Sequence, residues 1–169
     1  MHHATDYHLR VRRASFEAMN CSIAQCLEVV GEWWSFLILR EAFFGVTRFD
    51  DFRERLGIAR NTLDDRLGAL VDAGVLERVA YSEHPPRYDY RLTTKGKDLW
   101  PVLAAMRQWG DRWAAPHGPP VEYVHRTCRQ VVQVLPTCSG CGEPLALRDL
   151  RVVIGPGGGD IPVLPAQAS

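Results

Sequence analysis

Apolar side chains in the first part of the chain recur three and four residues apart, the spacing of one face of a helix. The pattern predicts a helix over residues 22–30 and a second helix over residues 32–44. The second helix carries so many apolar residues that we expect it to be central and buried on most sides. A short third helix over residues 50–56 is followed, after a turn of about four residues, by a fourth helix that begins at Ala59 or Asn61.

Further along the chain the pattern changes from helical spacing to alternation. Residues 75–79 and 88–92 alternate apolar and polar side chains, which predicts a β-hairpin. Its polar, proline-containing connection over residues 82–87 should project into solvent. A long helix capped by Thr94 is expected next, with more exposed apolar surface than a domain of this size needs, and Pro101 can kink it.

Helix, short turn, helix and projecting hairpin is the element order of a winged helix-turn-helix, in which the second helix of the pair enters the DNA major groove. Burying the apolar residues of the fourth helix turns its first turn and one polar face outward. Arginine, asparagine and threonine there can bond base edges or phosphates, although a solvated helix face is the plainer interpretation. The candidate DNA-binding residues are Arg60, Asn61, Thr62, Asp65 and Arg66 on the helix and Arg78 and Arg87 on the hairpin.

Charge and composition limit the possible functions. Lys and Arg number 20 and so do Asp and Glu, so a DNA partner must be held by a local patch of charge. No export signal or membrane-spanning segment is visible, which favours the cytoplasm and no membrane partner. Glycine-rich phosphate loops, nucleophile elbows and paired carboxylates are also missing from the sequence, so we expect no enzyme.

Prolines and glycines cluster in the last third of the chain and suggest its organisation. No internal repeat is visible. The predicted parts are an N-terminal arm or helix at 1–20, the winged-helix domain at 21–113, a linker at 114–120, an appendage at 121–154 and a flexible tail at 155–169. The fold class is therefore mainly α, in the α+β sense: a winged helix-turn-helix with a long C-terminal dimerisation helix and a small appendage.

The appendage contains four soft metal ligands in two pairs. His125 and Cys128 are followed, nine residues later, by Cys138 and Cys141. This spacing suits one tetrahedral Zn²⁺ ion in a zinc-ribbon-like unit, which is too small to fold without the metal. A thiol-redox enzyme that uses Cys138 and Cys141, or incidental cysteines, are the alternatives.

Several short motifs in order, across residues 21–113, carry a resemblance to a known family. They are Gly31-Glu32-Trp33-Trp34, Leu37-Ile38-Leu39-Arg40-Glu41, Arg48-Phe49-Asp50-Asp51-Phe52, Pro86-Arg87-Tyr88-Asp89-Tyr90 and Trp109-Gly110. With these motifs the chain resembles the HxlR-type transcriptional regulators, relatives of the MarR-like winged-helix proteins. The resemblance implies a cytoplasmic homodimer that binds double-stranded operator DNA with two-fold character. Its dimer contacts would come from the N-terminal and long C-terminal helices, and we expect a repressor rather than an activator.

The chain departs from this family at its recognition helix. Gly68 and Ala69 stand where relatives often carry basic residues. Part of the charge that holds DNA would then have to come from arginines elsewhere. Candidates ahead of the domain are Arg10, Arg12 and Arg13.

Effector sensing is the last candidate function. Cys21 matches the N-terminal cysteine with which some members of the family sense oxidants or electrophiles, whereas a buried apolar role is the interpretation we favour for Cys26. Trp33 and Trp34 could line a pocket for a small-molecule effector, but aromatic residues on a central helix are more often core. A protein-interaction winged helix that does not bind DNA also stays open, because the net charge is zero.

Overall fold

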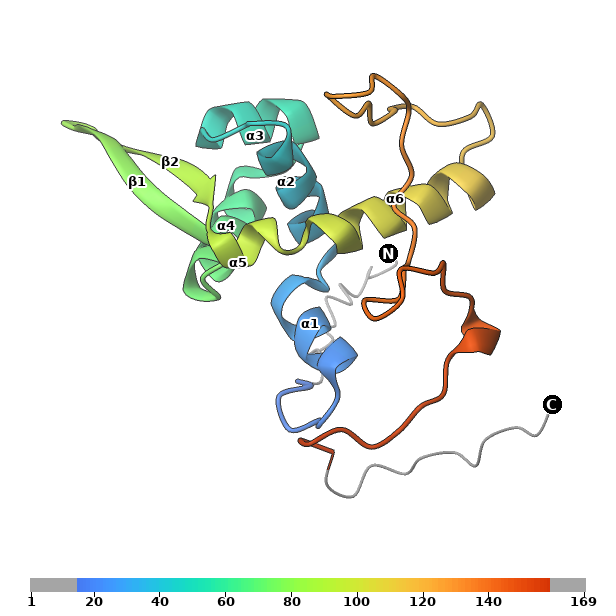
Figure 1. Ribbon diagram of the computed structural model, residues 1–169. Helices are drawn as coiled ribbons and strands as arrows, with labels where there is room; N and C mark the ends of the chain where they lie inside the picture. Colours follow the sequence, from blue (N-terminus) through green and yellow to red (C-terminus); the bar gives the residue numbers. More distant parts are fainter. Residues whose placement is uncertain (1–14, 159–169) are drawn as a thin grey trace, which may run out of the picture.

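The computed structural model describes residues 15–158 and is mostly helical, with a two-stranded antiparallel sheet (Figure 1). The helices before the sheet are α1 (Ser22–Val30), α2 (Trp33–Phe43), α3 (Phe49–Leu56) and α4 (Arg60–Asp72). The strands are β1 (Leu76–Glu83) and β2 (Pro86–Leu92). After them come α5 (Thr94–Lys97), α6 (Trp100–Trp113) and the short 3₁₀ helix η1 (Leu147–Asp149).

One hydrophobic core joins α1–α4 to the base of the hairpin. The helix-turn-helix pair contributes side chains at helical spacing on α4, as predicted, and this fixes which face of α4 remains outside. The buried cluster comprises Val30, Ile38, Leu39, Phe52, Ile58, Leu63, Leu67, Leu70, Val75, Leu76 and Tyr90.

Helix α2 is central, but its first residue is not buried. Ser35, Ile38, Leu39 and Glu41 lie inside, whereas Trp33 is 86% exposed. The expectation of burial on most sides is therefore wrong at the start of α2. The wide apolar stripe of the sequence includes a residue that points away from the core.

The hairpin is longer than predicted. β1 pairs with β2 from Leu76 opposite Leu92 to Glu83 opposite Pro86, so most of the predicted polar connection is itself strand. The tip projects from the body as a wing (Figure 1). At the base, the Tyr90 backbone N–H donates to the Thr47 carbonyl oxygen at 2.7 Å, which ties the segment before α3 to β2.

The predicted single helix from Thr94 is broken in two. Thr93, not Thr94, caps α5: its Oγ1 accepts from the Gly96 N–H at 3.1 Å and donates to the Gly74 carbonyl at 2.7 Å. These bonds tie α5 to the base of the sheet. Pro101 lies in the first turn of α6, where its missing N–H costs no helical hydrogen bond, so it begins a helix and does not kink one.

Within residues 15–158 no single helix is long and apolar enough to cross a membrane. Among the described helices, α1 and α2 taken together are the one pair that reaches that length and composition, and a 78° bend separates them.

Candidate nucleic-acid interface

A polar groove lies between the helix-turn-helix pair and the wing. Its walls come from the start of α3, the start of α4 and both strands of the hairpin. Three of the predicted DNA-binding residues, Arg60, Arg78 and Arg87, line it together with Arg48. Residues distant in sequence thus place four guanidinium groups around one concavity, beside the carboxylates of Asp50, Asp51 and Asp64, which leaves a small excess of positive charge. Guanidinium groups in such a place can bind phosphates.

Aromatic rings hold three of these arginines in place. The guanidinium carbon of Arg60 lies 5.4 Å from the centre of the Phe49 ring. Arg78 lies 4.3 Å from the ring of Tyr88, across the two strands. Such cation–π contacts fix a long side chain without using its hydrogen-bond donors, so these donors remain available to a ligand.

Arg48 is the groove arginine that sequence reasoning missed. It forms an isolated antiparallel bridge with Asp89 on β2, and its guanidinium carbon lies 4.9 Å from the Tyr81 ring on β1. Both contacts join residues that are far apart in the sequence, by 33 positions for Tyr81 and by 41 for Asp89. The only local signal was a basic residue one position before the first helix of the pair.

The remaining predicted residues on α4 lie outside this groove. Asn61 and Asp65 are exposed and Thr62 is half-buried, all on the outer side of the helix. Arg66 turns toward the start of α2, where its Nη1 lies 4.0 Å from Glu32 Oε1. Three further predicted basic residues fall outside the described residues: Arg10, Arg12 and Arg13.

The carboxylate of Asp89 secures the base of the wing. Hydrogen bonds from Arg91 Nη2 at 2.9 Å and from Thr47 Oγ1 at 3.2 Å lower the pKa of Asp89, against the opposing effect of partial burial. The carboxylate therefore stays charged at neutral pH and fixes β2 against the segment that leads into α3.

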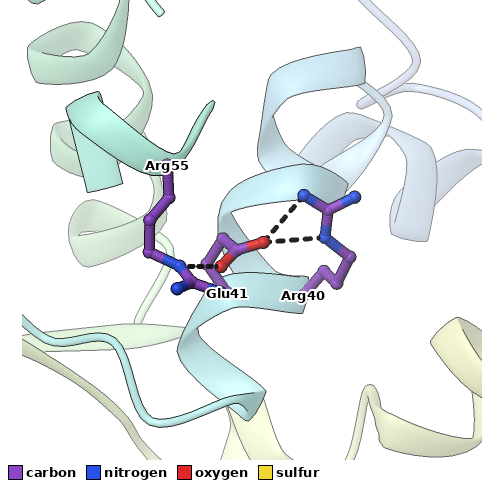
Figure 2. Close-up of polar contacts among 3 residues, drawn as sticks. All are labelled: Arg40, Glu41 and Arg55. Atoms are coloured by element: carbon purple, nitrogen blue, oxygen red, sulfur yellow. Dashed lines mark hydrogen bonds and ion pairs between the residues drawn. The ribbon is translucent and has the colours of Figure 1, made fainter. Parts of the chain in front are cut away.

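A buried carboxylate links α2 to α3 (Figure 2). Glu41 is 3% exposed; its Oε1 accepts from Arg40 Nε at 2.9 Å and Nη2 at 2.7 Å, and its Oε2 accepts from Arg55 Nε at 2.5 Å. Burial alone would raise the pKa of Glu41, but the hydrogen bonds and charges of Arg55 and Arg40 outweigh it and hold this pKa below its ordinary value. The ion cluster sets the position of α3, and with it one wall of the groove.

The two cysteines of the N-terminal region differ in exposure. Cys21 is exposed at the N-cap of α1, and Cys26 is half-buried against the core, in agreement with the apolar role expected for it. Trp34 also packs against the core, whereas Trp33 is exposed, so the two tryptophans do not share one environment.

The four predicted metal ligands occupy two similar tight hairpins of the appendage. His125 Nδ1 lies 3.1 Å from Cys128 Sγ in the first. In the second, backbone N–H groups of Cys141 and Gly140, with the Cys141 side chain, lower the pKa of the Cys138 thiol. The structure does not bring the two pairs together, because within residues 15–158 no three His, Cys, Asp or Glu side chains lie close enough to share a metal ion.

Comparison with known proteins agrees with this geometry. The family model of the HxlR-like helix-turn-helix matches residues 29–118. A protein of Mycobacterium tuberculosis named as an HTH-type transcriptional regulator, Rv3095, is 45% identical over 137 residues, which cover 80% of this chain and 87% of that protein. A similarly named regulator of Synechocystis is 38% identical over 94 residues, covering 55% of this chain and 70% of that protein.

Solved structures of transcription regulators also match the fold of this chain. The crystal structure of PA1607, described as a proposed transcription factor, superposes with a TM-score of 0.74 at 42% identity, covering 83% of this chain and 99% of that chain. The redox regulator HypR in its reduced form gives a TM-score of 0.51 at 29% identity, over 54% of this chain and 92% of that chain.

The family and these relatives are transcription regulators, and the protein is not an enzyme. The resemblance drawn from the sequence motifs and the winged-helix fold are therefore both confirmed. The groove lies between helix α4 and the wing, the two elements with which such a fold contacts DNA. The chain is a transcriptional regulator with a helix-turn-helix DNA-binding fold, and it belongs to the HxlR-like helix-turn-helix family.

Proposed function

We propose that the protein is a homodimeric repressor that binds double-stranded operator DNA with α4 in the major groove and the wing beside the backbone. The observation that carries this proposal is the groove in which Arg48, Arg60, Arg78 and Arg87 meet. An overall net charge of zero offers no long-range attraction, so this local cluster has to supply the phosphate contacts.

The position of each residue on α4 determines which part of the DNA it would contact. Arg60 and Asn61 stand in the first turn, and Ala59 at the N-cap offers no side-chain cap to the N–H groups there. Asn61, Thr62 and Asp65 would face base edges, with Arg60 at a guanine or a phosphate. Arg66, held near α2, would meet the backbone beside the groove.

Exposed apolar residues on two helices support the homodimer. Outer faces of α1 and α6 carry large side chains that find no cover within the described chain, and Trp109 and Trp113 are each 65% exposed. Surfaces of this kind mark protein interfaces, and two-fold pairing would present two α4 helices to one duplex. The exposed residues are Ile23 and Leu27 on α1 and Val102, Met106, Trp109 and Trp113 on α6.

An oxidant is the effector that the structure favours, acting in the cytoplasm where thiols are otherwise reduced. Cys21 is exposed at the start of α1, one of the two helices with an uncovered apolar face. A peroxide would oxidise its thiolate to a sulfenic acid, which condenses with a second thiol to a disulfide and releases water. The solved structure titled as a redox regulator, HypR, shares the fold at 29% identity, which supports this part of the proposal.

Binding to the DNA upstream of the protein's own gene tests the proposal. Fluorescence anisotropy with that duplex should show binding. The logarithm of the association constant should fall against the logarithm of the salt concentration with a slope of about −5, as expected for about six neutralised phosphates. Arg60→Ala combined with Arg87→Ala should weaken binding by about 100-fold or more at an unchanged dimer mass. The matched control, Arg53→Ala with Lys97→Ala, removes two exposed basic residues outside the groove lining and should bind as the wild type does.

Two results would count against the proposal. A protein that shows a flat salt response, or that binds DNA equally well without Arg60 and Arg87, would be a protein-interaction winged helix. Diamide should change the DNA binding of the wild type and leave that of Cys21→Ser unchanged. If it leaves the DNA binding of the wild type unchanged too, the oxidant is removed from the proposal and the DNA-binding function stays in place.

A further inference from the structure

The appendage contains the same hairpin twice. Residues 123–132 and 136–145 each form a tight turn closed by one isolated β-bridge, Val124 with Val131 and Thr137 with Pro144. Three backbone hydrogen bonds recur thirteen residues later: Val132 to Tyr123 and Leu145 to Pro136, His125 to Gln130 and Cys138 to Glu143, Arg129 to His125 and Gly142 to Cys138.

Each hairpin places two ligand side chains at its tip. His125 and Cys128 occupy the same positions in the first turn as Cys138 and Cys141 in the second. The position after the second ligand has a left-handed backbone in both turns, with φ 77° at Gly142 and φ 61° at Arg129. Among the described residues, Arg129 is the one non-glycine with positive φ, a conformation that costs about 1 kcal/mol. Each turn with its two soft ligands is called a corner below, and two corners together provide the four ligands of a tetrahedral Zn²⁺ site.

The first hairpin is fastened to α6 of its own chain. The Tyr123 ring packs on Trp100 at 4.7 Å between centroids, and Arg107 Nη1 donates to the Val121 carbonyl at 2.8 Å. Just after the hairpin, the Gln108 amide bonds both the N–H and the carbonyl of Val134. These contacts fix the position of His125 and Cys128 relative to the helix.

The second hairpin is carried away from the first. Residues 137–154 run as an open arm away from the winged-helix body, and Asn20 Nδ2 donates to the Gly157 carbonyl at 2.8 Å where the chain comes back (Figure 1). Both ends of the arm are therefore held by the chain's own body, with the second pair of ligands between them. This arrangement keeps the two halves of the site apart within one chain, in agreement with the lack of any three clustered ligands in the described part.

The arm exposes large apolar side chains that nothing in the described chain covers. Leu147, Val152 and Val153 are 88%, 78% and 68% exposed. The accessible surface of the chain is 14132 Å², whereas a compact monomer of this mass exposes about 8,400 Å². Even if residues 1–14 and 159–169 are allowed the area of a fully extended chain, about 4,100 Å², about 10,000 Å² is left for the 144 residues 15–158, whereas a compact fold of that length exposes about 7,500 Å². An obligate dimer buries between about 1,000 and 2,500 Å² per subunit, so a dimer interface can account for this excess of about 2,500 Å².

We propose that a second copy of the chain covers this surface and completes two Zn²⁺ sites, each formed by His125 and Cys128 of one copy and Cys138 and Cys141 of the other. The proposal rests on the homodimer proposed above. Two-fold symmetry makes the exchange reciprocal, so every chain gives one corner and receives one, and the zinc-to-chain ratio is one. The same four ligands as in a zinc ribbon then bridge two subunits, which gives the appendage a role in holding the dimer.

Complementation between two full-length variants tests this assignment. One variant carries His125→Ala and Cys128→Ser, the other Cys138→Ser and Cys141→Ser, and each lacks one corner. Co-expressed with two different affinity tags that bind no metal and purified over both, they give a heterodimer with one complete site. The zinc content by mass spectrometry should then be about one ion per heterodimer, about two per wild-type dimer and about zero in either variant alone.

The outcomes separate the possibilities. A heterodimer without zinc, beside a wild type with one ion per chain, would show a site within each chain and overturn the proposal, as would a wild type without zinc. If the variants do not assemble, the wild-type protein decides. Removing zinc with a chelator should raise the dimer dissociation constant by about 100-fold if the metal bridges subunits, and an unchanged constant would reject the bridge. Operator binding is measured on the same samples. A wild type that is purified without zinc but still binds DNA would overturn the metal site and leave the proposed function in place.

Discussion

At the scale of single residues, Glu41 shows how the fold fixes the geometry of the DNA-binding elements. Its carboxylate is buried between Arg40 and Arg55, and it is satisfied by three hydrogen bonds. A buried charge of this kind is costly to leave without partners, so its partners and position are closely determined. It lies in the segment of α2 that carried part of the family resemblance, and the structure gives a physical reason for a carboxylate there.

Replacing this carboxylate should destabilise the protein. Glu41→Gln keeps the shape but removes the charge, so we expect the free energy of unfolding at pH 7 to fall by about 2 kcal/mol, because hydrogen bonds to charged groups are lost. Because the pKa of Glu41 is lowered in the folded state, its contribution is complete above the ordinary pKa of 4.5 and is lost as the pH falls through the lower folded value. Urea unfolding at several pH values measures both effects.

The control for this prediction is Glu54→Gln, an exposed carboxylate on α3. It should leave the stability within about 0.5 kcal/mol of the wild type. Equal losses in the two variants, or a loss for Glu41→Gln that persists unchanged at pH 3, would contradict the role given to the buried ion cluster.

Arg48 is the residue whose predicted role owes most to the structure. Arg48→Ala should weaken operator binding by about 5-fold and make the slope of log affinity against log salt less steep by about one, since one phosphate contact is lost. Arg53→Ala removes the same charge from an exposed site on α3 outside the groove lining and should change neither quantity. Anisotropy titrations at four salt concentrations measure both, and identical effects of the two substitutions would refute the groove as the contact surface.

The candidate site could be predicted from the sequence only in part. Arg60, Arg78 and Arg87 follow from the helix period and from strand alternation, which are local properties. Arg48 could not be found in this way, because its place beside the wing depends on the pairing of the segment before α3 with β2. Arg66 lies on the predicted helix, but its direction toward Glu32 is set by how α4 packs against α2.

At the scale of elements, the junction between the sheet and α5 determines where the last helix breaks. The residues of α5, Thr94 to Lys97, carry no apolar stripe, but no proline separates them from the stripe that begins at Leu99, so the sequence alone indicates one helix from Thr94. Tertiary contacts override it: Thr93 bonds the Gly74 carbonyl, and Gly96 packs directly on the backbone of Val75. The boundaries of α1 to α4 agree with the predictions within about two residues, since glycines such as Gly57 and Gly74, both with positive φ, end helices by a local backbone requirement.

A pair of glycine substitutions tests this junction. A Cβ at Gly96 would collide with the carbonyl oxygen of Val75, a backbone atom that cannot move aside, so Gly96→Ala should lower the free energy of unfolding by about 2 kcal/mol. Gly68 in α4 has open space around a Cβ and helical surroundings, so Gly68→Ala should raise stability by about 0.5 to 1 kcal/mol. Thermal unfolding distinguishes the two, and a neutral Gly96→Ala would show that α5 does not hold its place against the sheet.

At the scale of the whole molecule, the duplicated hairpin escapes sequence comparison. Between residues 123–132 and 136–145, Cys128 and Cys141 are the one identical pair, so the repeat is not visible in the sequence and is found only in the backbone hydrogen bonds. The ligand spacing alone indicated a single site within one chain. The separation of its two halves depends on how the appendage is anchored to α6 and to Asn20, which no local pattern encodes.

The uncovered apolar face of α6 gives the last prediction, which concerns assembly. Trp109 and Trp113 are exposed in the single chain, so their replacement by glutamate should not disturb the core, whereas in a dimer it would bury two charges. Trp109→Glu with Trp113→Glu should therefore raise the dimer dissociation constant by about 100-fold or more, as for the loss of two aromatic anchors. Sedimentation equilibrium measures this constant, with circular dichroism as a check of folding. Val79→Glu, an exposed apolar position on the wing, is the control and should remain dimeric.

Because two α4 helices must reach one duplex together, the tryptophan variant should also lose operator affinity at concentrations where it is monomeric, although none of its DNA-contacting residues has changed. A monomer that binds the full operator as tightly as the wild type would separate assembly from DNA recognition and refute the two-fold arrangement.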